Sequence, residues 1–166
     1  MTDFDSLSHD RKLACLAELA GDALGRYALA SPSAPVLINL SENATYRIDD
    51  AATGKRYALR VHRDGYHSRA GIASELAWLM ALREDGVVIT PKPVKGLDGE
   101  RIQSVGHAAM PRPRHVVLFD WETGEEPSEK DHLFDKFTLL GEVTARMHRH
   151  SEGWTRPAGF ERHTWD

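Results

Sequence analysis

Three groups of residues have types and spacings that could bind a phosphate-bearing ligand. Arg60 lies in an alternating stretch, residues 56–62, where it shares a strand face with Ala58. Glu75 lies in a later helical stretch, beside its apolar face, and could point across a sheet at Arg60. A guanidinium is a planar fork that can hold carboxylate and phosphate oxygens together. The polar residues 41–43 (Ser-Glu-Asn) are typical of a turn, and such a turn could cover the phosphates.

Each of these residues also has a plainer interpretation. Arg60 could face solvent and pair with any surface carboxylate, and Glu75 could be an ordinary solvated helix residue. Asn43 could serve only the geometry of its turn. The phosphate-binding interpretation therefore requires Arg60 to meet Glu75. If the two side chains lay far apart, only an unrelated α+β structural protein would remain.

The periodicity of the apolar residues predicts the elements that position these side chains. Helical spacing predicts helices over about residues 8–26, 68–82 and 128–148. Short apolar or alternating runs predict strands at residues 36–40, 46–48, 56–62, 101–105 and 115–119. The order is helix, three strands, helix, two strands, helix. It predicts an α+β fold with a five-stranded, mostly antiparallel sheet and one inserted helix.

Composition and charge exclude several classes of protein. The chain has 166 residues, 41% of them hydrophobic, and 21 Lys+Arg against 25 Asp+Glu give a net charge of −4. This balance argues against nucleic-acid binding driven by bulk charge. No apolar run approaches the roughly 20 residues that cross a bilayer. The acidic N-terminus lacks the features of a signal peptide, so we expect a cytoplasmic protein without membrane association.

The residues that could bind a metal do not form a recognisable motif. The single cysteine, Cys15, cannot form an internal disulfide or a zinc cluster, and its place on an apolar helical stripe predicts burial. Nine histidines are present, but no pair has the His-x-x-x-His spacing on a helix. We therefore expect no histidine metal site.

Five phrases of the sequence carry a family resemblance. They are LSENATYRI at 40–48, YALRVHR at 57–63, Glu75-Leu76, LFDWETGE at 118–125 and LGEVTARMH at 140–148. In this order they resemble the aminoglycoside phosphotransferase/choline kinase-like family of small-molecule kinases, in particular its homoserine-kinase-like and stress-response-kinase-like members, and the resemblance covers about residues 10–166. No single phrase is diagnostic, but their order and spacing together are fairly specific.

The resemblance implies roles for individual residues. Arg60 would be the third-strand cation that meets the ATP phosphates, and Glu75 would be its helical partner. A turn covering the phosphates would be formed by Ser41, Glu42, Asn43 and Ala44. The adenine would lie between Ile48 and Ala58. A hinge whose backbone groups read the adenine edge would be formed by Phe119, Asp120, Trp121 and Glu122. The turn lacks the glycines of protein kinases, and Asn43, which tolerates a positive φ, is expected to replace them in part.

The resemblance also implies a division of the chain. Residues 1–118 would form a protein-kinase-like, nucleotide-binding N-terminal lobe, with residues 1–34 as a helical extension. Residues 119–166 would form a hinge and a linker helix that leads to a C-terminal lobe absent from this chain. That lobe would hold most of the magnesium and would bind a small-molecule hydroxyl acceptor.

Catalytic residues cannot be assigned from this sequence. The family uses a His-Gly-Asp-x-x-x-x-Asn loop and a later metal-binding Asp, and neither follows residue 148. We therefore assign no catalytic and no metal-binding residue and expect residues 1–166 alone to lack phosphotransferase activity. The alternative is a non-catalytic module that binds nucleotide or a partner. Its lobe interface would expose apolar side chains and support self-association.

Overall fold

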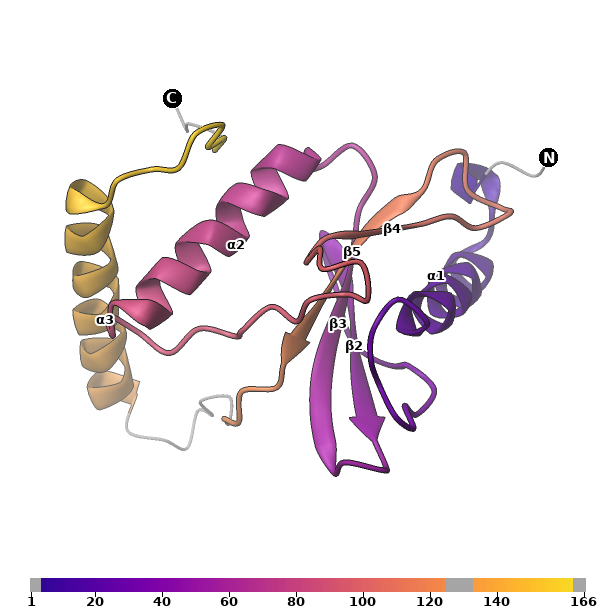
Figure 1. Cartoon of the computed structure of the whole chain (residues 1–166), viewed down its shortest axis with the longest axis horizontal. Helices are drawn as coiled ribbons and strands as arrows, with labels where there is room; N and C mark the ends of the chain where they lie inside the picture. Colours follow the sequence, from indigo (N-terminus) through magenta and orange to yellow (C-terminus); the bar gives the residue numbers. More distant parts are fainter. Residues whose placement is uncertain (1–3, 125–132, 163–166) are drawn as a thin grey trace.

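Helices α1 (His9–Leu24) and α2 (Arg69–Glu84) lie on opposite faces of one sheet, and α3 (Leu133–Gly153) lies outside α2 (Figure 1). The structure is a computed structural model and describes residues 4–124 and 133–162. A short 3₁₀ helix, η1 (Phe4–Ser6), precedes α1. After α3, the chain turns back over α2 toward its N-terminal end (Figure 1). The layers are therefore α1, sheet, α2 and α3.

The sheet has five strands and is antiparallel throughout. They are β1 (Val36–Leu40), β2 (Asn43–Asp50), β3 (Lys55–His62), β4 (Gln103–Val105) and β5 (Arg114–Asp120). Their order across the sheet is β1-β2-β3-β5-β4. The register places Thr45 opposite Arg60 and Arg47 opposite Ala58. The predicted α+β class with an inserted helix is confirmed.

The face of the sheet toward α1 carries the main core. Alternate residues of β2 are buried, and Tyr46 and Ile48 pack with Leu19 of α1 and Leu59 of β3. Alternation with a period of two places these side chains on one face. Ser8 caps α1, as its hydroxyl accepts the N–H of Arg11 at 3.4 Å. The predicted burial of Cys15 is confirmed.

The opposite face carries a smaller core under α2. Ile72 and Leu76 of α2 pack against Val117 and Phe119 of β5, and Ala58 of β3 packs against this cluster. Among the described residues, this cluster includes none from β1 or β2. Helix α2 therefore covers only part of this face and leaves the side of β2 that carries Thr45 and Arg47 outside the core.

Several predicted boundaries differ from the structure. Strand β2 continues to Asp50, because the buried carboxylate of Asp50 accepts the N–H groups of Ala30, Ser31 and Ala52 and ties the preceding segment to this strand. Strand β4 begins at Gln103 instead of residue 101, and β5 ends at Asp120, one residue beyond the predicted strand end. Helix α3 continues to Gly153; the predicted helix start at residues 128–132 lies outside the described residues. No helix in the described ranges could span a membrane.

Candidate functional site

The predicted contact between Arg60 and Glu75 is present. The Nη1 atom of Arg60 lies 2.8 Å from Oε1 of Glu75, and their side chains are 28% and 23% exposed. The guanidinium carbon of Arg60 also lies 5.1 Å from the ring centroid of Phe119, which is buried. Arg60 is therefore held from two sides while part of its fork remains accessible. The unrelated α+β protein, which required these residues to lie apart, is excluded.

The segment at residues 41–43 forms the connection between β1 and β2. Leu40 pairs with Ala44 across it, and the Ser41 N–H donates to the Asn43 carbonyl at 3.1 Å. The exposed carboxylate of Glu42 pairs with Arg63 at 2.8 Å. Asn43 belongs to β2, and none of the described non-glycine residues has a positive φ. The expected glycine-like conformation of Asn43 is therefore corrected, since its backbone is that of a strand.

Two of the predicted contact residues lie on the wrong face of the sheet for a ligand that meets Arg60. Ala44 and Ile48 are 3% and 0% exposed and belong to the core under α1. The β2 residue opposite Ala58 is Arg47 instead. The prediction that Ile48 lines the adenine is corrected, because adjacent strand residues point to opposite faces.

Sequence reasoning missed the β2 residues that share a face with Arg60. Thr45 lies opposite Arg60 and Arg47 opposite Ala58, and Val36 of the edge strand β1 pairs with Arg47. The available signal was the alternation of polar and apolar residues from Asn43 to Asp49. Because the buried alternate residues of β2 pack on α1, Thr45 and Arg47 between them point to the face of Arg60.

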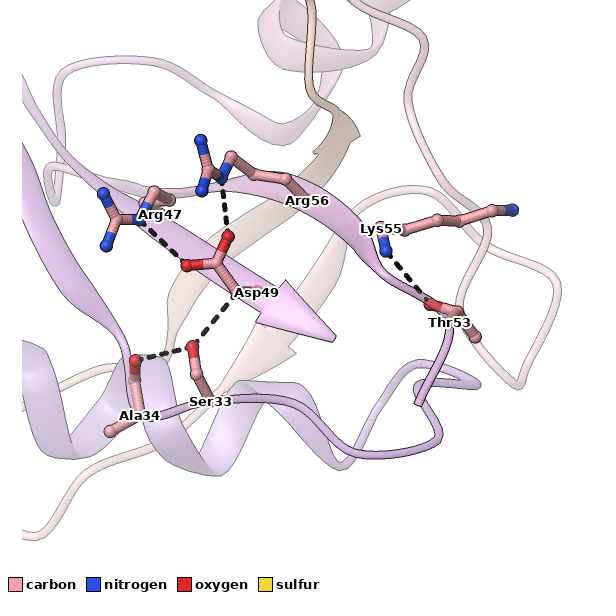
Figure 2. A network of polar contacts seen from close by, with 7 residues as sticks. All are labelled: Ser33, Ala34, Arg47, Asp49, Thr53, Lys55 and Arg56. Carbon is pink, nitrogen blue, oxygen red and sulfur yellow. Dashed lines mark hydrogen bonds and ion pairs between the residues drawn. The ribbon is translucent and has the colours of Figure 1, made fainter. Parts of the chain in front are cut away.

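Two arginines share one carboxylate at the outer end of this face (Figure 2). Asp49 Oδ1 lies 2.6 Å from Nε of Arg56, and Asp49 Oδ2 lies 3.1 Å from Nε of Arg47. The hydrogen bond from Arg56, together with the charges of both arginines, lowers the pKa of Asp49. The guanidinium of Arg56 also stacks on Trp121, 5.5 Å from its ring centroid. This part of the face therefore carries a net positive charge beside Ala58.

The predicted hinge is already engaged in internal contacts. Phe119 and Asp120 belong to β5, and the side chain of Phe119 is buried under α2. The N–H of Asp120 donates to the Lys92 carbonyl at 2.9 Å, and that of Trp121 donates to the Arg56 carbonyl at 3.3 Å. The carboxylate of Glu122 pairs with Arg83 at the end of α2, at 2.6 Å. The N–H groups of Asp120 and Trp121 are therefore not free to read a base.

His62 was not predicted, although it follows Arg60 on the same face of β3. Its side chain is 3% exposed, and neither ring nitrogen has a hydrogen-bond partner. It pairs across the sheet with Asn43, whose side-chain oxygen is also buried without a partner. Burial, reinforced by the charge of Arg60, lowers the pKa of His62 to about 3. The imidazole beside Arg60 is therefore neutral, so Arg60 supplies the positive charge there.

Acid is expected to destabilise the protein through His62. Its folded pKa lies below the usual value of about 6.5, so the unfolded chain binds a proton that the folded chain does not. The stabilisation is present above about pH 6.5 and is lost as the pH falls toward 3. Urea unfolding should show a loss of about 2 kcal/mol between about pH 7 and pH 5, mostly absent in His62→Leu. An equal loss in both proteins would contradict the assignment.

The described residues do not form a metal site. Within residues 4–124 and 133–162, no group of three or more His, Cys, Asp or Glu side chains is arranged to hold a metal ion. The arrangement around Arg60 fits an anionic ligand instead, because the cations there lie beside a partly open sheet face.

Comparison with known proteins decides the family. The sequence profile of the phosphotransferase enzyme family matches residues 36–166. The chain belongs to this family. Searches of curated proteins found no match.

Two solved structures resemble this phosphotransferase-family chain. The microcompartment-associated aminopropanol kinase is 46% identical, with a TM-score of 0.78, over 90% of this chain and 45% of that one. Amicoumacin kinase in complex with AMP-PNP, Ca²⁺ and Ami is 23% identical, with a TM-score of 0.75, over 95% of this chain and 47% of that one. The second likeness shows the fold alone. The chain spans about half the length of the structures it matches.

The family match leaves out α1 of this phosphotransferase-family chain and includes α3. It begins at Val36, the first residue of β1, so η1 and α1 precede it. It includes α3, whose apolar side chains are strongly exposed. These are Phe134 at 83%, Phe137 at 66%, Leu139 at 55% and Leu140 at 57%. The expected exposed apolar surface is therefore present on α3.

Proposed function

We propose that this chain is the nucleotide-binding portion of an ATP-dependent kinase that phosphorylates a hydroxyl of a small molecule. The observation that carries the proposal is the Arg60–Glu75 pair, at 2.8 Å, beside a partly open sheet face. When a carboxylate binds one edge of a guanidinium, the other N–H groups of that guanidinium can donate to a second anion. Family membership supports the same chemistry. Residues 1–118 would form the nucleotide-binding lobe, and residues 119–166 the hinge and linker.

Each part of the site would have a separate role toward ATP. Arg60 would bind the α and β phosphates under the β1–β2 connection, residues 41–43. Ala58 would leave room for the purine, with Arg47 beside it on β2. Because the N–H groups of Asp120 and Trp121 are engaged, the backbone of Glu122, the last residue of the predicted hinge, would read the purine edge. Magnesium would be held mainly by a C-terminal lobe, as the family resemblance implies.

The acceptor is proposed only as a class. One solved structure, 46% identical to this chain, is an aminopropanol kinase. By this similarity, we propose a small amino alcohol as the acceptor. Its hydroxyl oxygen would attack the terminal phosphorus of ATP and lose its proton to a base supplied by the C-terminal lobe, while the bond from that phosphorus to the β–γ bridging oxygen breaks and ADP leaves. By its motifs, we propose that the chain is similar to the homoserine-kinase-like or stress-response-kinase-like members of the family.

We also propose a cytoplasmic location, with no nucleic acid or membrane as a partner.

Nucleotide binding tests this proposal directly. Titration with ATP and Mg²⁺ should raise the unfolding temperature and show saturable binding by calorimetry. A ligand that binds only the folded state adds about 2.7 kcal/mol at 100 times its Kd. Adenosine, which lacks phosphates, is the control and should bind far more weakly. No stabilisation at millimolar ATP would overturn the proposal.

The exposed apolar side chains of α3 favour a second candidate, a non-catalytic module that pairs with a copy of itself. Phe134, Phe137, Leu139 and Leu140 lie within two helical turns and are more than half exposed. Burying such side chains against a second α3 would remove apolar surface from water on both copies.

This candidate predicts concentration-dependent self-association. Sedimentation equilibrium should show an average mass that rises with protein concentration. The double variant Phe137→Glu, Leu140→Glu should remain monomeric, because two charges would be buried in the contact. Lys136→Glu, an exposed position on the same helix, is the matched control and should associate like the unmodified protein. A monomer at all concentrations would exclude the second candidate.

A further inference from the structure

Helix α2 carries Glu75, so the position of α2 determines where Arg60 is held. On its sheet side, α2 is tied to the rest of the lobe by polar contacts at both ends. Near its start, Arg69 Nη1 donates to the Ile102 carbonyl at 2.9 Å. Near its end, Arg83 pairs with Glu122, and the Thr90 hydroxyl donates to the Leu79 carbonyl at 2.6 Å. These contacts lie on the side of α2 that faces the sheet and the hinge.

On its outer side, α2 and its C-cap are contacted by His150 of α3. The indole N–H of Trp78 donates to Nδ1 of His150 at 3.3 Å, and Nε2 of His150 lies 2.9 Å from Oδ2 of Asp85. The side chain of His150 is 9% exposed and stacks on Trp154, with ring centroids 6.0 Å apart. Trp78 and Asp85 lie about two helical turns apart. His150 therefore fixes α2 at two points along its axis.

The chemistry of the two partners determines the protonation of His150. An indole N–H can only donate, so Nδ1 of His150 must accept and carries no proton. The proton is then on Nε2, where it is donated to the carboxylate of Asp85. A neutral imidazole with this tautomer satisfies both contacts at once. The amide of Gln or Asn likewise offers an acceptor and a donor on two separate atoms close together.

Trp78 connects this contact to the candidate site. It lies three residues after Glu75, so the two side chains are neighbours on the helix surface. Both line the same cleft of about 1210 Å³, between α2 and residues 160–162. A rotation of α2 that moved Trp78 would therefore move Glu75 away from Arg60. The Ser68 hydroxyl, which donates to Glu161 at 2.8 Å, holds the other end of α2 to the same C-terminal segment.

We propose that His150 is a positioning residue: through Trp78 and Asp85 it sets α2 so that Glu75 holds Arg60 toward a bound triphosphate. The proposal rests on the proposed nucleotide-binding function. The polar and ring contacts of His150 are with Trp78, Asp85 and Trp154, so its effect on nucleotide affinity would pass through α2. The docking of α3 and the orientation of the phosphate-binding cation are then coupled.

The first test measures ATP affinity in two backgrounds. His150→Leu should weaken ATP affinity about fivefold in the unmodified protein and less than about 1.5-fold in the Glu75→Gln variant. If His150 acts through Glu75, the effects of the two substitutions on affinity are not additive. His150→Gln, which keeps an acceptor and a donor, should restore most of the affinity. His148→Leu, an exposed histidine on the same helix, should have no effect. Equal losses in both backgrounds would overturn the proposal.

A second test needs no nucleotide and so separates the two proposals. The coupling between Arg60 and Glu75, measured by a double-mutant cycle in urea unfolding, should fall by about half in the His150→Leu background. Trp78→Phe keeps an aromatic ring but replaces the indole with a smaller ring that has no N–H, and it should also lower the Arg60–Glu75 coupling. If ATP does not bind, the proposed function fails, and this cycle still decides the role of His150. An unchanged coupling in both variants would contradict that role.

Discussion

Arg60→Ala should lower the affinity for ATP about 10- to 150-fold, the range expected when a charge-assisted hydrogen bond to an anion is lost. The guanidinium is the charged group that Glu75 holds beside the open part of the sheet. Arg60→Lys keeps the charge but loses the planar fork, so its loss should be smaller. Isothermal titration calorimetry with ATP and Mg²⁺ measures both.

Two control variants separate the loss of ATP affinity in Arg60→Ala from a general disturbance of the fold. Arg11→Ala removes an exposed arginine of α1 and should bind ATP normally. Glu75→Gln should weaken binding less than Arg60→Ala, because the cation stays but loses its orientation. If Arg60→Ala binds ATP as tightly as the unmodified protein, the phosphates are bound elsewhere.

Ile48→Ala should destabilise the protein by about 3 kcal/mol, as is typical when a buried aliphatic side chain is truncated. Ile48 is 0% exposed and packs in the core between the sheet and α1. Arg47→Ala, one residue earlier, should change stability by less than about 1 kcal/mol, because its ion pair with Asp49 is partly exposed. Urea unfolding measures both variants.

The effects on ATP affinity should be the reverse of the effects on stability. Arg47→Ala should weaken ATP binding, because Arg47 lies opposite Ala58 on the face of Arg60. Ile48→Val, which keeps most of the core volume, should leave affinity unchanged. If Ile48→Val lost ATP affinity and Arg47→Ala kept it, Ile48 would line the adenine, as the motif predicted. That result would contradict the observed register.

Much of the fold could be predicted because its signals are local. Alternation over residues 56–62 and helical spacing over residues 68–82 place β3 and α2 correctly to within a few residues. The Arg60–Glu75 contact also followed, since it needs only adjacent elements and the direction of two side chains. The Ser8 and Ser68 caps at the starts of α1 and α2 have the usual residue type for that position.

Register and distant contacts could not be predicted in the same way. Motif alignment placed Ile48 at the adenine, but cross-strand pairing selects Arg47, and a shift of one residue reverses every side chain in a strand. His150 and Trp78 are 72 residues apart in sequence, and their contact depends on how α3 docks. The burial of the His62 ring, whose nitrogens have no hydrogen-bond partner, likewise does not follow from the alternation of β3, which places it on the same face as the partly exposed Arg60.

The most direct measurement is a crystal structure of the protein with a non-hydrolysable ATP analogue and Mg²⁺. We expect the α and β phosphate oxygens to lie within hydrogen-bond distance of the Arg60 guanidinium, with Glu75 still paired to it. The purine should lie against Ala58, on the face of the sheet opposite α1. A nucleotide bound on any other surface, or none at saturating concentration, would contradict the assignment of this face as the nucleotide site.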